Sequence, residues 1–229
     1  MKMDTPRNDM VQMATARANV YGLLADVFRE APSDALLSKL REPECSDALT
    51  ALNLSLDEMF ESTPQDQLNE NLAIEYTRLF IGPSSHISPH ESMHTDARFG
   101  EKKALWGEQT VEVKKFMEAA GLKVNDAFGG MPDHISAELE FMQQLLLKEA
   151  EAWTNQEHEL GQNILNIQKR FYDEHLSKWV SNFCNDVIEK TGLPFYKQFS
   201  EVTKDFIELE KETLKDLMIE AKEGDRLSA

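Results

Sequence analysis

Apolar residues recur every three or four positions along most of this chain, which is the spacing of one face of an α-helix. The expected helices cover residues 11–28, 35–40, 46–60, 63–80 and 101–120, a segment that begins after Asp133, two segments within 160–190, and a last helix that begins at Pro194. No run of β-branched residues alternates long enough to predict a strand. We therefore expect an all-α fold, formed by one compact domain over residues 1–229 with roughly nine to eleven helices.

Capping residues mark several of the expected helix ends. Ser33 can cap the helix over 35–40, and Gly121 can end the helix over 101–120. Asp133 precedes the most regular apolar pattern in the chain, and we expect it to be the N-cap of that helix. Between the helices lie a loop over 82–100 and a turn over 129–133, and a structureless loop of the first length often carries function.

The helix that ends near residue 80 stops on Gly82-Pro83. Proline cannot continue the helical hydrogen bonds, and glycine can adopt a left-handed cap. We expect this break to present Tyr76 and Phe80 at a surface, where aromatic and polar groups can hold a peptide. The alternative is that both side chains belong to the core, which is common for aromatic residues at helical spacing.

The charge of the chain bears on the partners it can bind. With 229 residues and a formal net charge of −17, the surface repels nucleic acid and anionic lipid and attracts cationic partners. The acidity could also serve solubility alone. Cys45 and Cys184 are far apart and form no metal-binding pair, which agrees with a reducing compartment. The polar N-terminus and the lack of long apolar runs predict a cytoplasmic protein with no stable membrane insertion.

Two groups of histidines could carry chemistry. His134 lies between Asp133 and Glu138, so it could read a cationic ligand, with the carboxylates favouring imidazolium. Alternatively, these residues are a capping aspartate and an exposed His–Glu pair. The second group has a spacing of four and could bind zinc on a helix, but Pro89 interrupts it. Its members are His86, His90 and His94.

The sequence contains no nucleophile-elbow or nucleotide-binding motif, since GxSxG, GxxxxGK[ST] and GxGxxG are all absent. The letters HExxH occur at His90-Glu91-Ser92-Met93-His94, but they lie in the loop over 82–100, where no regular helix is expected, whereas zinc proteases carry this motif on a helix. We therefore expect a binding protein, not an enzyme. The alternatives are a metal-dependent hydrolase that uses His/Asp/Glu clusters, and a generic helical adaptor.

Three segments together resemble the TorD/DmsD/NarJ family of molybdoenzyme maturation chaperones, also called redox enzyme maturation proteins. The first is Arg17-x-x-x-Tyr21-x-Leu23-Leu24-Ala25-x-x-Phe28. The central segment, which we call the first signature, is Glu75-Tyr76-x-x-Leu79-Phe80-x-Gly82-Pro83 followed by Pro89-x-Glu91-Ser92. The last segment, which we call the second signature, is Pro132-Asp133-His134-x-x-x-Glu138-Leu139-x-Phe141-Met142. Met131 departs from the acidic residue that the family often has before Pro-Asp-His, which bears on partner preference.

The resemblance implies a TorD-like, all-helical cytoplasmic chaperone with no catalytic turnover and no cofactor of its own. Its partners would be the catalytic subunit of a molybdoenzyme, of the formate dehydrogenase, DMSO/TMAO reductase or nitrate reductase type, and that subunit's twin-arginine leader peptide. It would assist cofactor insertion and delay export until folding is complete. Carried over by position, the residues that would line or shape the peptide site are Tyr76, Leu79, Phe80, Gly82, Pro83, Pro89, Glu91, Ser92, Asp133 and His134.

Overall fold

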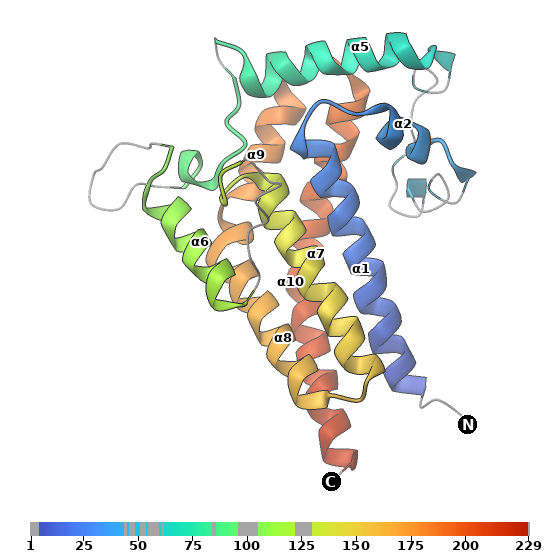
Figure 1. Ribbon diagram of the computed structural model, residues 1–229, viewed down its shortest axis with the longest axis vertical. Helices are drawn as coiled ribbons and strands as arrows, with labels where there is room; N and C mark the ends of the chain where they lie inside the picture. The colour runs from blue at the N-terminus through green and yellow to red at the C-terminus, as the bar shows by residue number, and fades with distance from the viewer. Residues whose placement is uncertain are drawn as a thin grey trace.

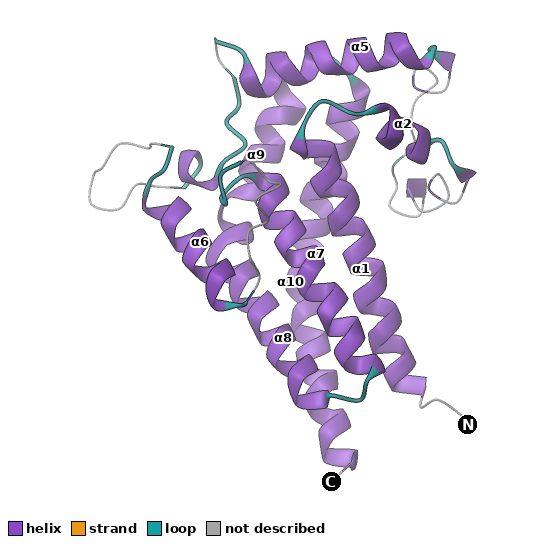
Figure 2. Cartoon of the chain, viewed as in Figure 1, coloured by secondary structure: helices purple, strands orange, loops and turns teal. Residues whose placement is uncertain are grey.

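The computed structural model confirms the all-α class. It describes residues 5–43, 45, 49–50, 54, 60, 62–83, 86–95, 105–121 and 130–228. The α-helices in these residues are α1 (Thr5–Arg29), α2 (Asp34–Leu40), α5 (Gln65–Tyr76), α6 (Glu108–Ala119), α7 (Ile135–Thr154), α8 (His158–Phe171), α9 (Ser177–Lys190) and α10 (Pro194–Ser228). They are fewer than the nine to eleven expected, and the described residues contain no strand (Figure 2). Most of the helix expected over 46–60 lies outside the described residues.

The long helices run along one axis and form a bundle. Helix α1 packs along α7, α7 packs on α8, and α10 packs on both α8 and α9 (Figure 1). Helix α5 lies across one end of the bundle, with α2 beside it, and α6 lies against the side near α8 (Figure 1). None of the described helices is long and apolar enough to span a lipid bilayer.

Two π-helical turns extend α-helices of the bundle. Thr77–Ile81 continues α5, and Tyr172–Leu176 joins α8 to α9. A π-turn widens the helix and is frequent at functional sites. Both turns adjoin the segments that carry the candidate site.

Several predicted helix ends are confirmed. The Ser33 side chain accepts a hydrogen bond from the Leu36 N–H, Gly121 has a φ of 72°, and α10 begins at Pro194. Gly82 was predicted wrongly, because its φ of −56° and ψ of 154° are not left-handed. A β-carbon at Gly82 would lie 3.3 Å from the carbonyl oxygen of Thr77, so this position requires a close backbone approach instead.

The aromatic residues before Gly82 are core residues. Tyr76 and Phe80 are buried, so the expectation that the helix break presents them at a surface is wrong. The Phe80 ring packs on Phe28 and Phe183, and the Tyr76 hydroxyl donates to the carbonyl oxygens at the end of α1. These contacts tie α5 to α1 and α9.

A buried polar network crosses the middle of the bundle. The Arg17 guanidinium donates two hydrogen bonds to the Glu210 carboxylate, at 2.9 and 2.7 Å, and one to Gln168 at 3.1 Å. Tyr21 donates to the same Glu210 carboxylate, and Gln168 donates to Glu149. The network joins α1, α7, α8 and α10, and all of these side chains are buried.

Candidate functional site

The two signatures meet in a short antiparallel bridge. The Glu91 N–H donates to the carbonyl oxygen of Asp133, and the Ile135 N–H donates to that of Pro89, each at 2.9 Å. His90 lies directly opposite His134 in this bridge. Because side chains alternate along extended backbone, the two imidazoles share one face while Glu91 and Asp133 point to the other. We call residues 88–92 with 132–136 the seam.

The inner face of the seam carries a buried cluster of acids. A 3.0 Å hydrogen bond joins the Glu91 carboxyl group to Nδ1 of His175, which lies on the π-turn between α8 and α9. Glu138 accepts a 3.1 Å hydrogen bond from the Trp179 indole, and Asp133 accepts one from the Ser92 N–H. Burial raises the pKa of Glu138 well above its ordinary value, and the nearby carboxylates Glu91 and Asp133 add to the shift. A protonated Glu138 lowers the charge of this cluster.

The outer face of the seam carries the two histidines, with their rings 5.0 Å apart and nearly perpendicular. Each Nδ1 has a hydroxyl partner, Ser88 for His90 and Ser136 for His134. Burial, His90 and Arg29 lower the pKa of His134 to about 3, and burial also lowers the pKa of His90. The expectation that carboxylates favour imidazolium at His134 is therefore wrong. Both rings are neutral at pH 7.

His134, and not Asp133, is the N-cap of α7. Its Nδ1 accepts a hydrogen bond from the Ser136 N–H, whereas the Asp133 carboxylate reaches across the seam to Ser92. Glu138 is fully buried, so the alternative of an exposed His–Glu pair is also wrong. The local sequence pattern predicted correctly that α7 begins here. It assigned the cap to Asp133, whose carboxylate instead accepts a hydrogen bond from Ser92.

Replacing His134 with asparagine should flatten the acid side of the stability curve. The folded state keeps this imidazole neutral, while the unfolded chain takes up a proton near pH 6.5. The unfolded state therefore binds more protons between about pH 6.5 and pH 3, and stability falls as the pH is lowered through that window. Asparagine can cap a helix but does not titrate. Between pH 7.5 and pH 5, the free energy of unfolding measured in urea should fall less in His134→Asn than in the wild type, by on the order of 1 kcal/mol. An equal fall in both proteins would contradict a neutral His134 in the folded state.

A second contact fixes the start of the first signature. Glu75 forms two 2.7 Å hydrogen bonds with the Arg78 guanidinium and accepts another, at 2.6 Å, from the Gly192 N–H. Arg78 also donates to the carbonyl oxygen of Lys190. The end of α5 is thus attached to the turn between α9 and α10. Arg78 was not among the residues predicted from sequence.

The predicted site residues fall into three groups. Tyr76, Leu79 and Phe80 are core residues, so they can shape a site but do not line a surface. Gly82 and Pro83 lie just beyond the π-turn, and Pro83 is exposed. The remaining residues come together in the seam, and of these His134 alone is partly exposed. They are Pro89, Glu91, Ser92, Asp133 and His134. The assignment of all ten to a peptide site remains a prediction.

The histidine series of the loop does not converge. His94 contacts the Ser88 carbonyl oxygen through Nε2 and stacks on Trp179, while His90 faces His134. Within the part of the chain that the structure describes, no three His, Cys, Asp or Glu side chains could hold a metal ion together. Cys45 and Cys184 are both free.

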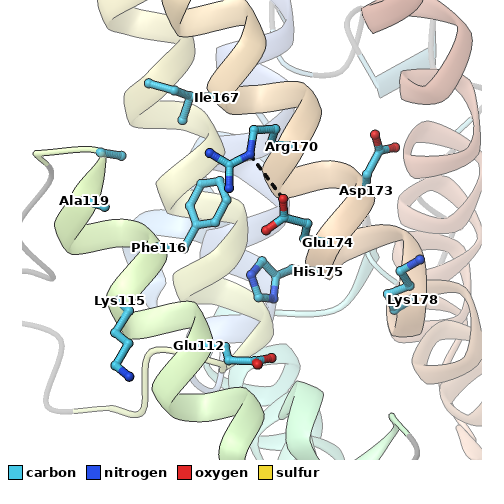
Figure 3. A pocket seen from close by; sticks show the side chains of 11 residues that line it. Glu112, Lys115, Phe116, Ala119, Ile167, Arg170, Asp173, Glu174, His175 and Lys178 are labelled. Carbon is cyan, nitrogen blue, oxygen red and sulfur yellow. Dashed lines mark hydrogen bonds and ion pairs between the residues drawn. The ribbon is translucent and has the colours of Figure 1, made fainter.

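A groove of about 650 Å³ lies between α6 and the α8–π-turn segment (Figure 3). The buried His175 lines it and so connects it to the seam through Glu91. Phe116 of α6 packs edge-on against Phe171 and His175. Sequence reasoning missed this groove, because its lining comes from helices more than forty residues apart. The residues that line it are Glu112, Lys115, Phe116, Ala119, Ala120, Ile167, Arg170, Asp173, Glu174, His175 and Lys178.

Comparison with known proteins identifies the family. A family model described as nitrate reductase delta subunit matches residues 42–185. The chaperone protein TorD of Shewanella sp. (strain ANA-3) is 23% identical over 221 residues, which cover 91% of this chain and 98% of that protein. The chaperone protein TorD of Shewanella loihica is 26% identical over 224 residues, covering 93% and 99%. That of Vibrio atlanticus is 26% identical over 212 residues, covering 86% and 94%. The chain therefore belongs to the nitrate reductase delta subunit family, as a TorD/NarJ-type chaperone of molybdoenzyme maturation and not an enzyme.

Proposed function

We propose that this chaperone binds the twin-arginine signal peptide, the apo form, or both, of a molybdopterin-dependent oxidoreductase in the cytoplasm. There it assists cofactor insertion and delays export until the client has folded. The client is a catalytic subunit of the formate dehydrogenase, DMSO/TMAO reductase or nitrate reductase type.

The seam is the observation that carries the proposal. Two sequence segments some forty residues apart are held together by backbone bonds and a buried acid cluster, and they place the partly exposed side chains of His90 and His134 side by side. A neutral imidazole does not repel a guanidinium as an imidazolium would, and it can accept a hydrogen bond from it through the ring nitrogen that carries no hydrogen. Nδ1 of His134 already accepts from the Ser136 N–H, so its Nε2 is a donor for a peptide carbonyl, while His90 can accept from an arginine through Nε2 when its Nδ1 donates to Ser88. The outer face of the seam is thus compatible with an arginine-containing ligand.

The charge of the whole chain supports the same class of ligand. A net charge of −17 attracts a basic leader from a distance and speeds encounter more than it strengthens the final complex. Association should consequently slow as salt is added, because the Debye length falls to about 8 Å at physiological ionic strength.

Titration calorimetry with synthetic leaders of the molybdoenzymes encoded in the same genome tests the proposal. We expect one leader to bind and a scrambled peptide of equal charge not to bind. His134→Asn keeps the helix cap and should weaken that binding while the protein stays folded. If no leader and no apo-enzyme from that genome binds the wild-type protein, the proposal is wrong.

A further inference from the structure

The groove between α6 and α8 already contains a bound guanidinium, that of Arg170. Its central carbon lies 5.1 Å from the centre of the Phe116 ring, and its Nε donates a 3.2 Å hydrogen bond to Glu174 (Figure 3). An aromatic face beneath and a carboxylate beside are two of the partners that proteins use to recognise arginine. The groove thus holds an arginine-recognition arrangement, filled by a side chain of the protein itself.

The Arg170 side chain is held only weakly in this position. It is 65% exposed, and the Glu174 side chain that it contacts is 48% exposed. An ion pair this exposed contributes little to stability, and a cation–π contact at an exposed site is likewise weak. Phe116, by contrast, is fixed from behind by Phe171 and His175. The receiving surface is therefore firm while its present occupant can move into solvent.

The groove carries apolar and charged groups side by side. Ile167 and Ala119 lie toward one end, Phe116 and Glu174 lie in the middle beside Arg170, and Glu112 and Lys178 lie toward the other end (Figure 3). A peptide that places a cation beside Glu174 could therefore cover Phe116 and Ile167 with an adjoining apolar part.

We propose that this groove binds an arginine side chain of the client's leader over Phe116, beside Glu174, and that Arg170 is an internal placeholder which the client arginine displaces. The proposal rests on the proposed function, and it adds the location of the arginine subsite and a competitor within the protein. Because His175 lines the groove and bonds to Glu91, a peptide in the groove would also contact the residue that anchors the seam.

If Arg170 is a placeholder, its removal should increase the affinity for the leader, since the client arginine no longer has to displace it. Two further cations, Lys115 and Lys178, line the same groove, and in the described part of the chain neither has an ion-pair partner. Lys178→Ala therefore removes one positive charge from the groove without vacating the ring, and it serves as the matched control.

The test compares two synthetic peptides, a twin-arginine leader that the wild-type protein binds and the same leader with both arginines changed to lysine. For the arginine peptide we expect Arg170→Ala to tighten the Kd by about two- to fivefold, more than Lys178→Ala does, and the excess to be absent for the lysine peptide. Phe116→Leu and Glu174→Gln should each weaken binding of the arginine peptide. Melting curves confirm that each variant is folded.

Equal gains in affinity for the arginine peptide in Arg170→Ala and Lys178→Ala would show that only the charge of the groove matters. That result would contradict the placeholder role of Arg170. Unchanged affinity in all groove variants, with leader binding intact in the wild type, would place the arginine site elsewhere and leave the proposed function standing. Failure of the wild type to bind any leader would instead refute the proposed function itself.

Discussion

Replacing Arg17 with alanine should destabilise the fold by about 3–5 kcal/mol, the cost of leaving one partner of a buried ion pair without the other. Arg17 is 4% exposed and Glu210 is 1% exposed, so water cannot solvate the carboxylate that remains. Gln168 and Tyr21 would still donate hydrogen bonds within the network, but neither carries a compensating charge. Because the network joins four helices of the bundle, the whole bundle should lose stability together, and unfolding should remain one cooperative transition.

Urea unfolding measures this loss, and Arg29→Ala is the control. Arg29 pairs with Glu140 at 3.2 Å on the surface, with its side chain 37% exposed, so its removal should cost less than about 1 kcal/mol. A similar small loss in both variants would show that the Arg17 network does not hold the bundle together.

Replacing Asp133 with alanine should also lower the free energy of unfolding, by about 2–4 kcal/mol. The Asp133 side chain is fully buried and accepts the 3.2 Å hydrogen bond of the Ser92 N–H. Its removal leaves a buried donor without an acceptor at the junction of the two signatures. Asp133→Asn keeps an oxygen acceptor and should lose less.

Hydrogen exchange of the backbone amides locates this effect. The Glu91 and Ile135 N–H groups, which form the bridge, should exchange faster in Asp133→Ala than in the wild type, whereas amides in the middle of α7 should change less. Uniform acceleration over the whole chain, or no change at the bridge, would contradict the role of Asp133 in closing the seam.

The sequence pattern predicted correctly those features that depend on residues within one or two helical turns. Ile135, Leu139, Met142 and Leu146 recur at helical spacing, and all four are buried in α7. Ser33 was correctly predicted as a cap, because a cap depends on residues within one turn.

The site could not be predicted to the same extent, because its contacts cross the chain. Glu91 meets His175 from 84 positions away, and Arg17 meets Glu210 from 193 positions away. Asp133 has the sequence context of an N-cap, but the distant Ser92 N–H uses its carboxylate, and the cap passes to the next residue. The family resemblance singled out the two signatures that meet in the seam, but it did not show which of their side chains face inward.

Affinity capture of this chaperone from cells of its own organism, grown under conditions that induce molybdoenzymes, tests the central claim most directly. We predict that mass spectrometry finds a molybdoenzyme catalytic subunit that retains its twin-arginine leader and lacks the molybdopterin cofactor. Capture of only the mature, cofactor-loaded enzyme, or of no molybdoenzyme at all, would contradict the account.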